Sequence, residues 1–324
     1  MLRIATRRSP LARAQAFQTG QLISARTGEP FELVAMAATG DLDPDRVVEA
    51  FESKGLFVDT IRQAVADGDC DLAVHSYKDL PTDPHPGLVI GAVPPREDPR
   101  DVLISRDGHA LATLPPAATV GTSSARRRLQ LLRAKPSLEV VALRGNLGTR
   151  LRAVAERRLD AAVVAAAGLR RLYTATEDGG AGPLGLAVTG APLEPGECLP
   201  APAQGALAIE RRADDPRAEA VCAAIDDRVS HVQVRAERAF LAAVGGGCLA
   251  PVGALCHAVP GGLELLGMIA DPVERRVLRV SLVGAADDPE ALGAALAEAA
   301  LAEGGDAMVR VIEQLRASTG SAGA

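Results

Sequence analysis

The sequence contains few aromatic residues and few lysines. Its 324 residues include no tryptophan, two tyrosines and five phenylalanines. Single-stranded nucleic acids bind by stacking their bases on aromatic side chains, so this scarcity argues against such a ligand. The formal charge of −6 also disfavours binding along a duplex, and we expect no nucleic-acid partner. Only three lysines accompany the arginines, namely Lys54, Lys78 and Lys135.

Long apolar runs and paired cysteines are also missing. No uninterrupted apolar stretch reaches membrane-spanning length, and the first eight residues are interrupted by three arginines, unlike a signal peptide. The five cysteines form no CxxC pair, and an odd count argues against a disulfide framework. The spacing of Cys248, Cys256 and His257 matches no common zinc site, so we expect no metal. These features predict a cytoplasmic protein without a membrane partner.

In contrast, arginine is concentrated in one segment. Between Gly121 and Arg171 there are twelve basic and three acidic residues, a local balance of +9 in an acidic chain. Crowding like charges costs free energy, so this segment predicts an anionic ligand. Guanidinium groups bind carboxylates and phosphates through two parallel hydrogen bonds, which favours small ligands carrying those groups.

The order of predicted elements indicates an α/β fold. Strands and helices alternate twice along the chain, which favours mainly parallel sheets with ligands at the carboxyl ends of the strands. In the first half we expect strands at 2–6, 31–37 and 71–76, with helices at 10–26 and 55–66. In the second half we expect strands at 139–143 and 161–166, a helix at 148–158, and a returning strand at 204–210. A final Ala-rich helical region is broken at Gly304 and Gly305.

Proline-rich crossings near 94–99 and 192–202 separate these patterns. We therefore predict two hinged, doubly wound α/β lobes, like the domains of periplasmic binding proteins, with a cleft between them. A smaller α+β domain follows. The expected boundaries are 1–97 with 200–216 for the first lobe, 98–199 for the arginine-rich second lobe, and 217–324 for the C-terminal domain.

Four arginines stand where a strand leads into a helix. Arg126 and Arg127 follow Ser124, and Arg144 and Arg150 lie on either side of a glycine turn. A helix N-terminus is already electropositive, so additional cations there indicate an anion that they share. The alternative is a solvated basic face paired with distant acids. That alternative is favoured for the arginines expected on helix surfaces: Arg128, Arg152, Arg157, Arg158 and Arg170.

Two further residues are candidates for chemistry. Asp79 follows a predicted strand beside Lys78, where a carboxylate can pair with a positive charge on a substrate or move a proton; a turn-capping aspartate is the alternative. Cys248 follows three glycines, so its thiol is open to a nucleophilic or cofactor-bearing role, with an inert loop cysteine as the alternative. His75 lies within a strand and is interpreted as a core histidine.

Taken in order, these segments resemble the hydroxymethylbilane synthase family, also called porphobilinogen deaminase. The resemblance runs from the N-terminus to Pro251 and includes several long motifs. The matching stretches are 3–12, 54–57, 73–81, 96–101, 120–127, 143–151, 167–172, 204–206 and 236–248. The resemblance implies an enzyme that joins four porphobilinogen molecules head to tail, with loss of ammonia, to form linear hydroxymethylbilane for tetrapyrrole biosynthesis.

The resemblance also assigns site residues. It implies a dipyrromethane cofactor attached covalently through Cys248, with Asp79 as the catalytic carboxylate. The implied cofactor-binding residues are Lys78, Ser124, Arg126, Arg127 and Arg144. The implied substrate-binding residues are Arg7, Ser9, Lys54, Phe57, Arg150, Arg171 and Gln204. The implied partners are porphobilinogen and the growing oligopyrrole, and the family precedent favours a monomer.

Some positions depart from the family pattern, and other functions compete. The usual Gly-Gln-Gly is Ala203-Gln204-Gly205, the helix after Phe57 reads Val58-Asp59-Thr60, and Gly245 stands where an acidic residue is frequent. The main alternative is a non-catalytic solute-binding protein, since two α/β lobes around an anion also build that class. The missing export signal and Cys248 count against it. A transcription factor with such an effector domain would need a helix-turn-helix segment, and none is evident.

Overall fold

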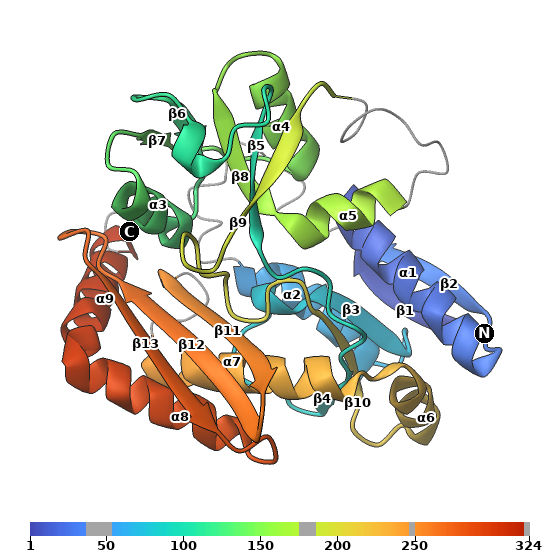
Figure 1. Cartoon of the computed structure of the whole chain (residues 1–324). Coiled ribbons are helices and arrows are strands. Elements are labelled where there is room, and N and C mark those ends of the chain that lie inside the picture. Colours follow the sequence, from blue (N-terminus) through green and yellow to red (C-terminus); the bar gives the residue numbers. More distant parts are fainter. Residues whose placement is uncertain (37–53, 175–185, 246–249, 321–324) are drawn as a thin grey trace. The chain divides into compact units, whose positions relative to one another are not determined.

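The computed structural model describes residues 1–36, 54–174, 186–245 and 250–320 (Figure 1). Within these ranges, side chains are described except at 54–57, 173–174 and 315–320. The chain divides into two compact units, the first formed by 1–97 with 206–231 and the second by 98–205 with 232–324. The three-domain boundaries expected from the sequence stay a prediction.

The first unit contains a five-stranded mixed sheet in the order β2-β1-β3-β10-β4. β1 is parallel to β2 and β3, whereas β10 is antiparallel to both of its neighbours. The strands are β1 (Leu2–Arg7), β2 (Phe31–Met36), β3 (Leu72–Ser76), β4 (Leu88–Ala92) and β10 (Leu207–Arg212). The helices are α1 (Pro10–Thr27), α2 (Lys54–Ala66) and α6 (Pro216–Ile225). A single 3-10 turn, Tyr77–Asp79, follows β3.

Helices cover both faces of this sheet, because successive strand residues point to opposite sides. Leu2 and Ile4 of β1 pack into the cluster that contains residues of α1 and α6. Ala5, the next residue of β1, points to the opposite face of the sheet and packs with Ile61 and Val65 of α2. The predicted doubly wound arrangement is therefore present in this unit.

The second unit repeats the plan with the order β7-β6-β8-β5-β9. β6 is parallel to β7 and β8, and β5 is antiparallel to β8 and β9. The strands are β5 (Asp101–Ser105), β6 (Thr119–Gly121), β7 (Glu139–Val141), β8 (Ala161–Ala165) and β9 (Thr189–Leu193). The helices are α3 (Ala125–Ala134), α4 (Leu147–Ala155) and α5 (Ala166–Thr174). Val163 packs with Leu131 of α3 on one face, and Val164 packs with Leu151 of α4 on the other.

A separate three-stranded antiparallel sheet lies toward the C-terminus. It consists of β11 (Val252–Val259), β12 (Gly262–Ala270) and β13 (Val277–Gly284). Buried side chains of α7 (Arg228–Val244), α8 (Pro289–Ala300) and α9 (Asp306–Gly320) share one core with this sheet. Residues 301–305 form a π turn between α8 and α9, where Gly304 has φ 101°. In the described ranges, no helix is long and apolar enough to span a membrane.

The structure confirms the α/β class, and two elements differ from their predicted bounds by three residues at one end, whereas the others differ by at most two. The strand expected at 204–210 begins at Leu207, because Ala203 and Gly205 have φ values of 60° and 90° and form a turn. The helix expected at 148–158 ends at Ala155, because Arg157 has φ 60°, a left-handed conformation that ends a helix.

Candidate anion-binding site

The predicted site arginines of the second unit lie just beyond the carboxyl ends of its parallel strands, in the turns and helices that follow them. α3 follows β6, α4 follows β7 and α5 follows β8. Parallel strands present these ends at the same edge of a sheet, which is where ligands of α/β proteins bind. This edge holds six residues predicted from the sequence: Ser124, Arg126, Arg127, Arg144, Arg150 and Arg171.

Short polar side chains start the helices at this edge. The Ser124 hydroxyl accepts the backbone N–H of Arg127 at 3.4 Å and caps α3. Asn146 caps α4 by accepting the N–H of Thr149 at 2.9 Å. These caps satisfy N–H groups that a first turn otherwise leaves without partners. The Ser124 side chain, predicted to bind the cofactor, therefore also fixes the helix that carries Arg126 and Arg127.

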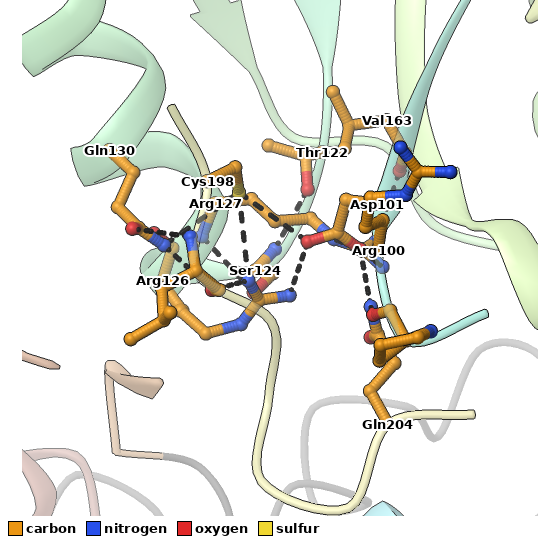
Figure 2. A network of polar contacts seen from close by, with 12 residues as sticks. Arg100, Asp101, Thr122, Ser124, Arg126, Arg127, Gln130, Val163, Cys198 and Gln204 are labelled. Atoms are coloured by element: carbon orange, nitrogen blue, oxygen red, sulfur yellow. Dashed lines mark hydrogen bonds and ion pairs between the residues drawn. The ribbon is translucent and has the colours of Figure 1, made fainter. Parts of the chain in front are cut away.

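Arg126 and Arg127 share one buried carboxylate, that of Asp101 at the start of β5 (Figure 2). Arg126 Nη2 lies 2.8 Å from Asp101 Oδ2, and its Nη1 donates to the Leu199 carbonyl at 2.6 Å. Arg127 donates to Asp101 Oδ1 from Nε at 3.1 Å and from Nη2 at 2.7 Å. Its Nη1 donates to the Val163 carbonyl at 3.0 Å. Asp101 is fully buried, and both arginines are nearly so.

The electrostatics of this cluster leave positive charge in excess. Burial alone would raise the pKa of Asp101, but the charges of Arg126 and Arg127 outweigh burial and hold that pKa well below its usual range. Burial and the neighbouring charge of Arg127 lower the pKa of Arg150. In the described part of the chain, Arg150 forms no ion pair, and its Nε donates to the Gly145 carbonyl at 3.0 Å. Arg126 and Arg127 thus share one carboxylate, and Arg150 lies close enough to Arg127 for its pKa to be lowered by that charge. Positive charge exceeds negative charge in this cluster, which is the charge balance of an anion site.

Gln204 joins the cluster through its side-chain amide. Its Nε2 donates to Asp101 Oδ1 at 2.9 Å and to the Pro99 carbonyl at 2.8 Å, and the residue is fully buried. Cys198 Sγ donates to Asp101 Oδ2 at 3.4 Å. The sequence predicted Gln204 as a substrate-binding residue, and the structure places its amide on a protein carboxylate. Asp101 itself was not singled out; its position at a strand start after a proline-rich crossing was the available signal.

The two other predicted site arginines of this unit, Arg171 and Arg144, lie in different environments. Arg171 of α5 is buried, and its Nη2 donates to the Gly205 carbonyl at 2.7 Å, next to Gln204 in the chain. Arg144 is exposed in the turn before α4. The structure therefore brings Arg126 and Arg127 together on Asp101, with Arg150 near Arg127 and Arg171 beside the segment that carries Gln204.

In the first unit, four predicted residues share the carboxyl edge of its sheet. Arg7 ends β1, and Lys78 and Asp79 lie in the turn after β3, its parallel neighbour. Ser9 caps α1 by accepting the N–H of Ala12 at 3.3 Å. Asp79 is exposed, whereas Lys78 and Arg7 are partly buried.

Three predicted residues cannot be placed at the level of side chains. Lys54 and Phe57 lie in the first turn of α2, whose backbone alone is described there. Cys248 lies outside the described residues. Their roles stay predictions.

A second buried ion cluster lies in the first unit, away from the strand ends. Arg62 of α2 donates to Glu210 of β10 from Nη2 at 2.8 Å and from Nε at 3.0 and 3.1 Å. His75 Nε2 lies 3.1 Å from Glu210 Oε2, close enough for an ion pair but not aligned for a hydrogen bond. All three residues are buried, so His75 is a core residue, as interpreted from the sequence.

Comparison with known proteins matches most of the chain to two family models. Residues 2–220 match "Porphobilinogen deaminase, dipyromethane cofactor binding domain", and residues 231–302 match "Porphobilinogen deaminase, C-terminal domain". A porphobilinogen deaminase of Moorella thermoacetica is 43% identical over 98% of this chain and 98% of its own length. The corresponding protein of Roseiflexus sp. is 43% identical over 94% of this chain and 97% of its own length.

Similarity to solved structures is weaker. The second substrate-binding domain of a putative amino acid ABC transporter from Streptococcus pneumoniae is 12% identical, covering 69% of this chain and 92% of that one, with a TM-score of 0.41. A score at this level establishes no shared arrangement, and the α/β assignment rests on the strand orders described above.

Proposed function

Because the chain belongs to the porphobilinogen deaminase family, we propose that it condenses four porphobilinogen molecules head to tail. Each addition releases ammonia, and the product is linear hydroxymethylbilane for tetrapyrrole biosynthesis. The relatives match nearly end to end, so the proposal draws on both domains of the family rather than on a shared fragment. The structural observation that carries it is the excess of positive charge around Asp101.

This charge suits the proposed substrate. Each porphobilinogen carries an acetate and a propionate, so a growing oligopyrrole gains two negative charges with every unit. Guanidinium forks bind carboxylates in two-point fashion, and burial strengthens such pairs by excluding water. Arg126 and Arg127 supply two forks that share one protein carboxylate, and Arg150 supplies a third fork near Arg127.

The same residues fit the proposed dipyrromethane cofactor, which carries the same acid groups and supplies an anchored pyrrole end to which new units are added. Arg126 and Arg127 would hold its carboxylates, with Arg150 half-buried beside Arg127. Arg144 and Lys78 are also proposed to bind the cofactor. Arg144 lies in the turn between β7 and α4, and Lys78 lies in the turn after β3. The proposed attachment through Cys248 rests on the sequence resemblance alone.

Asp79 is proposed as the catalytic carboxylate. Its exposure at the end of β3 leaves it open to a ligand, and Lys78 and Arg7 lie at the same sheet edge. A carboxylate there would pair with positive charge on the substrate and hold a proton for the departing amine. Arg7, Ser9, Lys54 and Phe57 are proposed to contact the incoming substrate, together with Arg150, Arg171 and Gln204 of the second unit.

The intact mass of the denatured protein, beside that of a Cys248→Ala variant, tests the proposal. We expect wild-type protein to carry the added mass of two linked pyrroles, to lose it in the variant, and to release ammonia from porphobilinogen. Wild-type protein that binds porphobilinogen but releases no ammonia, and gains no mass on incubation with it, would support the solute-binding alternative instead.

A paired substitution tests Asp79. Asp79→Ala should preserve the melting temperature and abolish most turnover. Asp83→Ala, an exposed aspartate in the following loop, serves as the matched control and should retain turnover. Equal turnover in the two variants would remove the role proposed for Asp79.

We also propose that the protein acts as a monomer in the cytoplasm. The family precedent supports the monomer, and the cysteine pattern of the sequence supports a reducing compartment. Light scattering on the purified protein tests the monomer: a mass near 33.4 kDa is expected, and twice that mass would contradict it.

A further inference from the structure

The Asp101 cluster contains two residues, Asp101 and Cys198, to which the proposed function assigns no contact with a ligand. Asp101 contacts Arg126, Arg127, Gln204 and Cys198, and both Asp101 and Gln204 are fully buried (Figure 2). The two Asp101 oxygens together accept from both guanidinium groups, from the Gln204 amide and from the Cys198 thiol. A carboxylate held by this many partners has one orientation, and it imposes an orientation on the arginines in turn.

This arrangement leaves donors for a ligand. A guanidinium group has five N–H groups. Arg127 uses three of them, on Asp101 and on the Val163 carbonyl. Arg126 also uses three, on Asp101, on the Leu199 carbonyl and on the Cys198 sulfur. Each fork therefore keeps two N–H groups that these contacts do not use.

The charge of the cluster separates it from an ordinary buried ion pair. Glu210 binds a single arginine, Arg62, in bidentate fashion, with His75 nearby. Asp101 binds two arginines and so leaves one unbalanced positive charge in a buried setting. An unbalanced buried charge is costly, and a ligand carboxylate entering beside the two forks would neutralise it. The Asp101 cluster is therefore built to be completed by an anion, whereas the Glu210 cluster is already complete.

We propose that Asp101 is a positioning residue that aligns the Arg126 and Arg127 forks to hold one carboxylate of the bound pyrrole chain. This inference rests on the proposed function and assigns Asp101 no contact with the ligand. Gln204 supports this role, because its side-chain amide donates to Asp101 Oδ1 and helps to hold the carboxylate in place. Without the Asp101 charge, the two guanidinium groups repel each other and lose their shared anchor, so the ligand meets two mobile cations instead of a fixed pair.

Asp101→Asn tests the proposal, with Glu210→Gln as the matched control. Both substitutions neutralise a buried carboxylate that binds arginine, and both are expected to lower the melting temperature. Only Asp101→Asn should lower the fraction of protein carrying the cofactor mass, to about a tenth of the wild-type fraction, as expected if ordering the forks contributes about one charge-assisted hydrogen bond. Glu210→Gln should carry the cofactor as wild type does. Equal loading of Asp101→Asn and wild type would overturn the proposal.

Gln204→Leu keeps the test decisive if Asp101→Asn does not fold. This variant removes one hydrogen bond to Asp101 and leaves all charges in place. The fraction of protein carrying the cofactor mass should fall below that of wild type, because the forks hold the cofactor carboxylates less well, whereas loss of a substrate contact by Gln204 would raise the KM for porphobilinogen without changing that fraction. An unchanged cofactor fraction would contradict the proposal. Wild-type protein without cofactor mass or ammonia release would instead refute the proposed function, so the two failures are distinguishable.

Discussion

The carboxylate of Glu237 accepts the backbone N–H of Ala203 at 2.6 Å, and both residues are fully buried. The other oxygen of Glu237 accepts the N–H of Cys256 in β11 at 2.8 Å. One side chain of α7 thus joins the segment preceding Gln204 to the C-terminal sheet. Because Gln204 donates to Asp101, the position of this segment bears directly on the arginine cluster.

Glu237→Gln should destabilise the protein although it preserves shape. Both carboxylate oxygens accept backbone N–H groups, so either orientation of a glutamine amide would place an NH2 group against one of them. A buried donor without an acceptor costs about 1–3 kcal/mol, and we expect a loss of that size in the free energy of unfolding. Urea denaturation measures it. Glu264→Gln, on the partly exposed β12 residue paired with His257, should cost under about 0.5 kcal/mol. Equal losses in both variants would contradict this account of Glu237.

Ala203→Gly should stabilise the protein. Ala203 has φ 60°, where a side chain carries a conformational cost of about 1–2 kcal/mol that glycine avoids. The greater freedom of glycine in the unfolded chain offsets about 0.5–1 kcal/mol, so the expected net gain is about 0.5–1 kcal/mol.

Ala208→Gly is the control for this gain. Ala208 is equally buried but lies within β10, where the same substitution should cost about 1 kcal/mol. Urea denaturation of both variants shows whether each substitution raises or lowers the free energy of unfolding. Destabilisation by Ala203→Gly comparable to that by Ala208→Gly would show that the left-handed conformation is not costly here.

The Glu210 cluster should make the free energy of unfolding depend on pH in the acidic range. Burial raises the pKa of Glu210, but the contacts from His75 and Arg62 outweigh it and lower the pKa to about 2. A carboxylate whose pKa is lower in the folded state than in the unfolded chain stabilises the folded protein at pH values above the unfolded pKa, which is near 4.5. This contribution is lost as the pH falls toward the folded pKa of about 2. The advantage of wild type over Glu210→Gln should therefore be constant above pH 5 and shrink by about 3 kcal/mol by pH 2. Urea denaturation of both proteins across this range tests it, and parallel curves would contradict it.

The buried cysteines should resist alkylation in the folded protein. Burial, reinforced by the charge of Asp101, raises the pKa of Cys198 to about 12, and burial raises that of Cys222 to about 12. Only the thiolate reacts readily with iodoacetamide, so at pH 8 neither residue should be modified without denaturant. Peptide mass spectrometry measures the modification. Fast labelling of Cys198 in native protein would contradict its burial beside Asp101, whereas labelling of both in urea is expected.

The sequence determined the elements and the anionic character of the ligand. The alternation of strands and helices is a local pattern that reads correctly without the structure, and the structure shows that Ser9 and Ser124 cap two of these helices. The concentration of arginine after Gly121 is likewise a property of the chain, and so is the order of motifs that indicated the family. The bounds that differed were set by single residues, Ala203 and Arg157, whose left-handed φ values no propensity predicts.

Only the tertiary structure decided which groups pair. Asp101 lies 25 residues before Arg126 and about a hundred before Gln204, and they meet because β5 runs antiparallel to β8, while α3 begins at the neighbouring strand end. The same holds for Glu237 with Ala203 and for Glu210 with Arg62. A sequence specifies which side chains are charged, but the counter-charge of a buried group depends on strand order and register, which bring residues remote in the chain within hydrogen-bond distance.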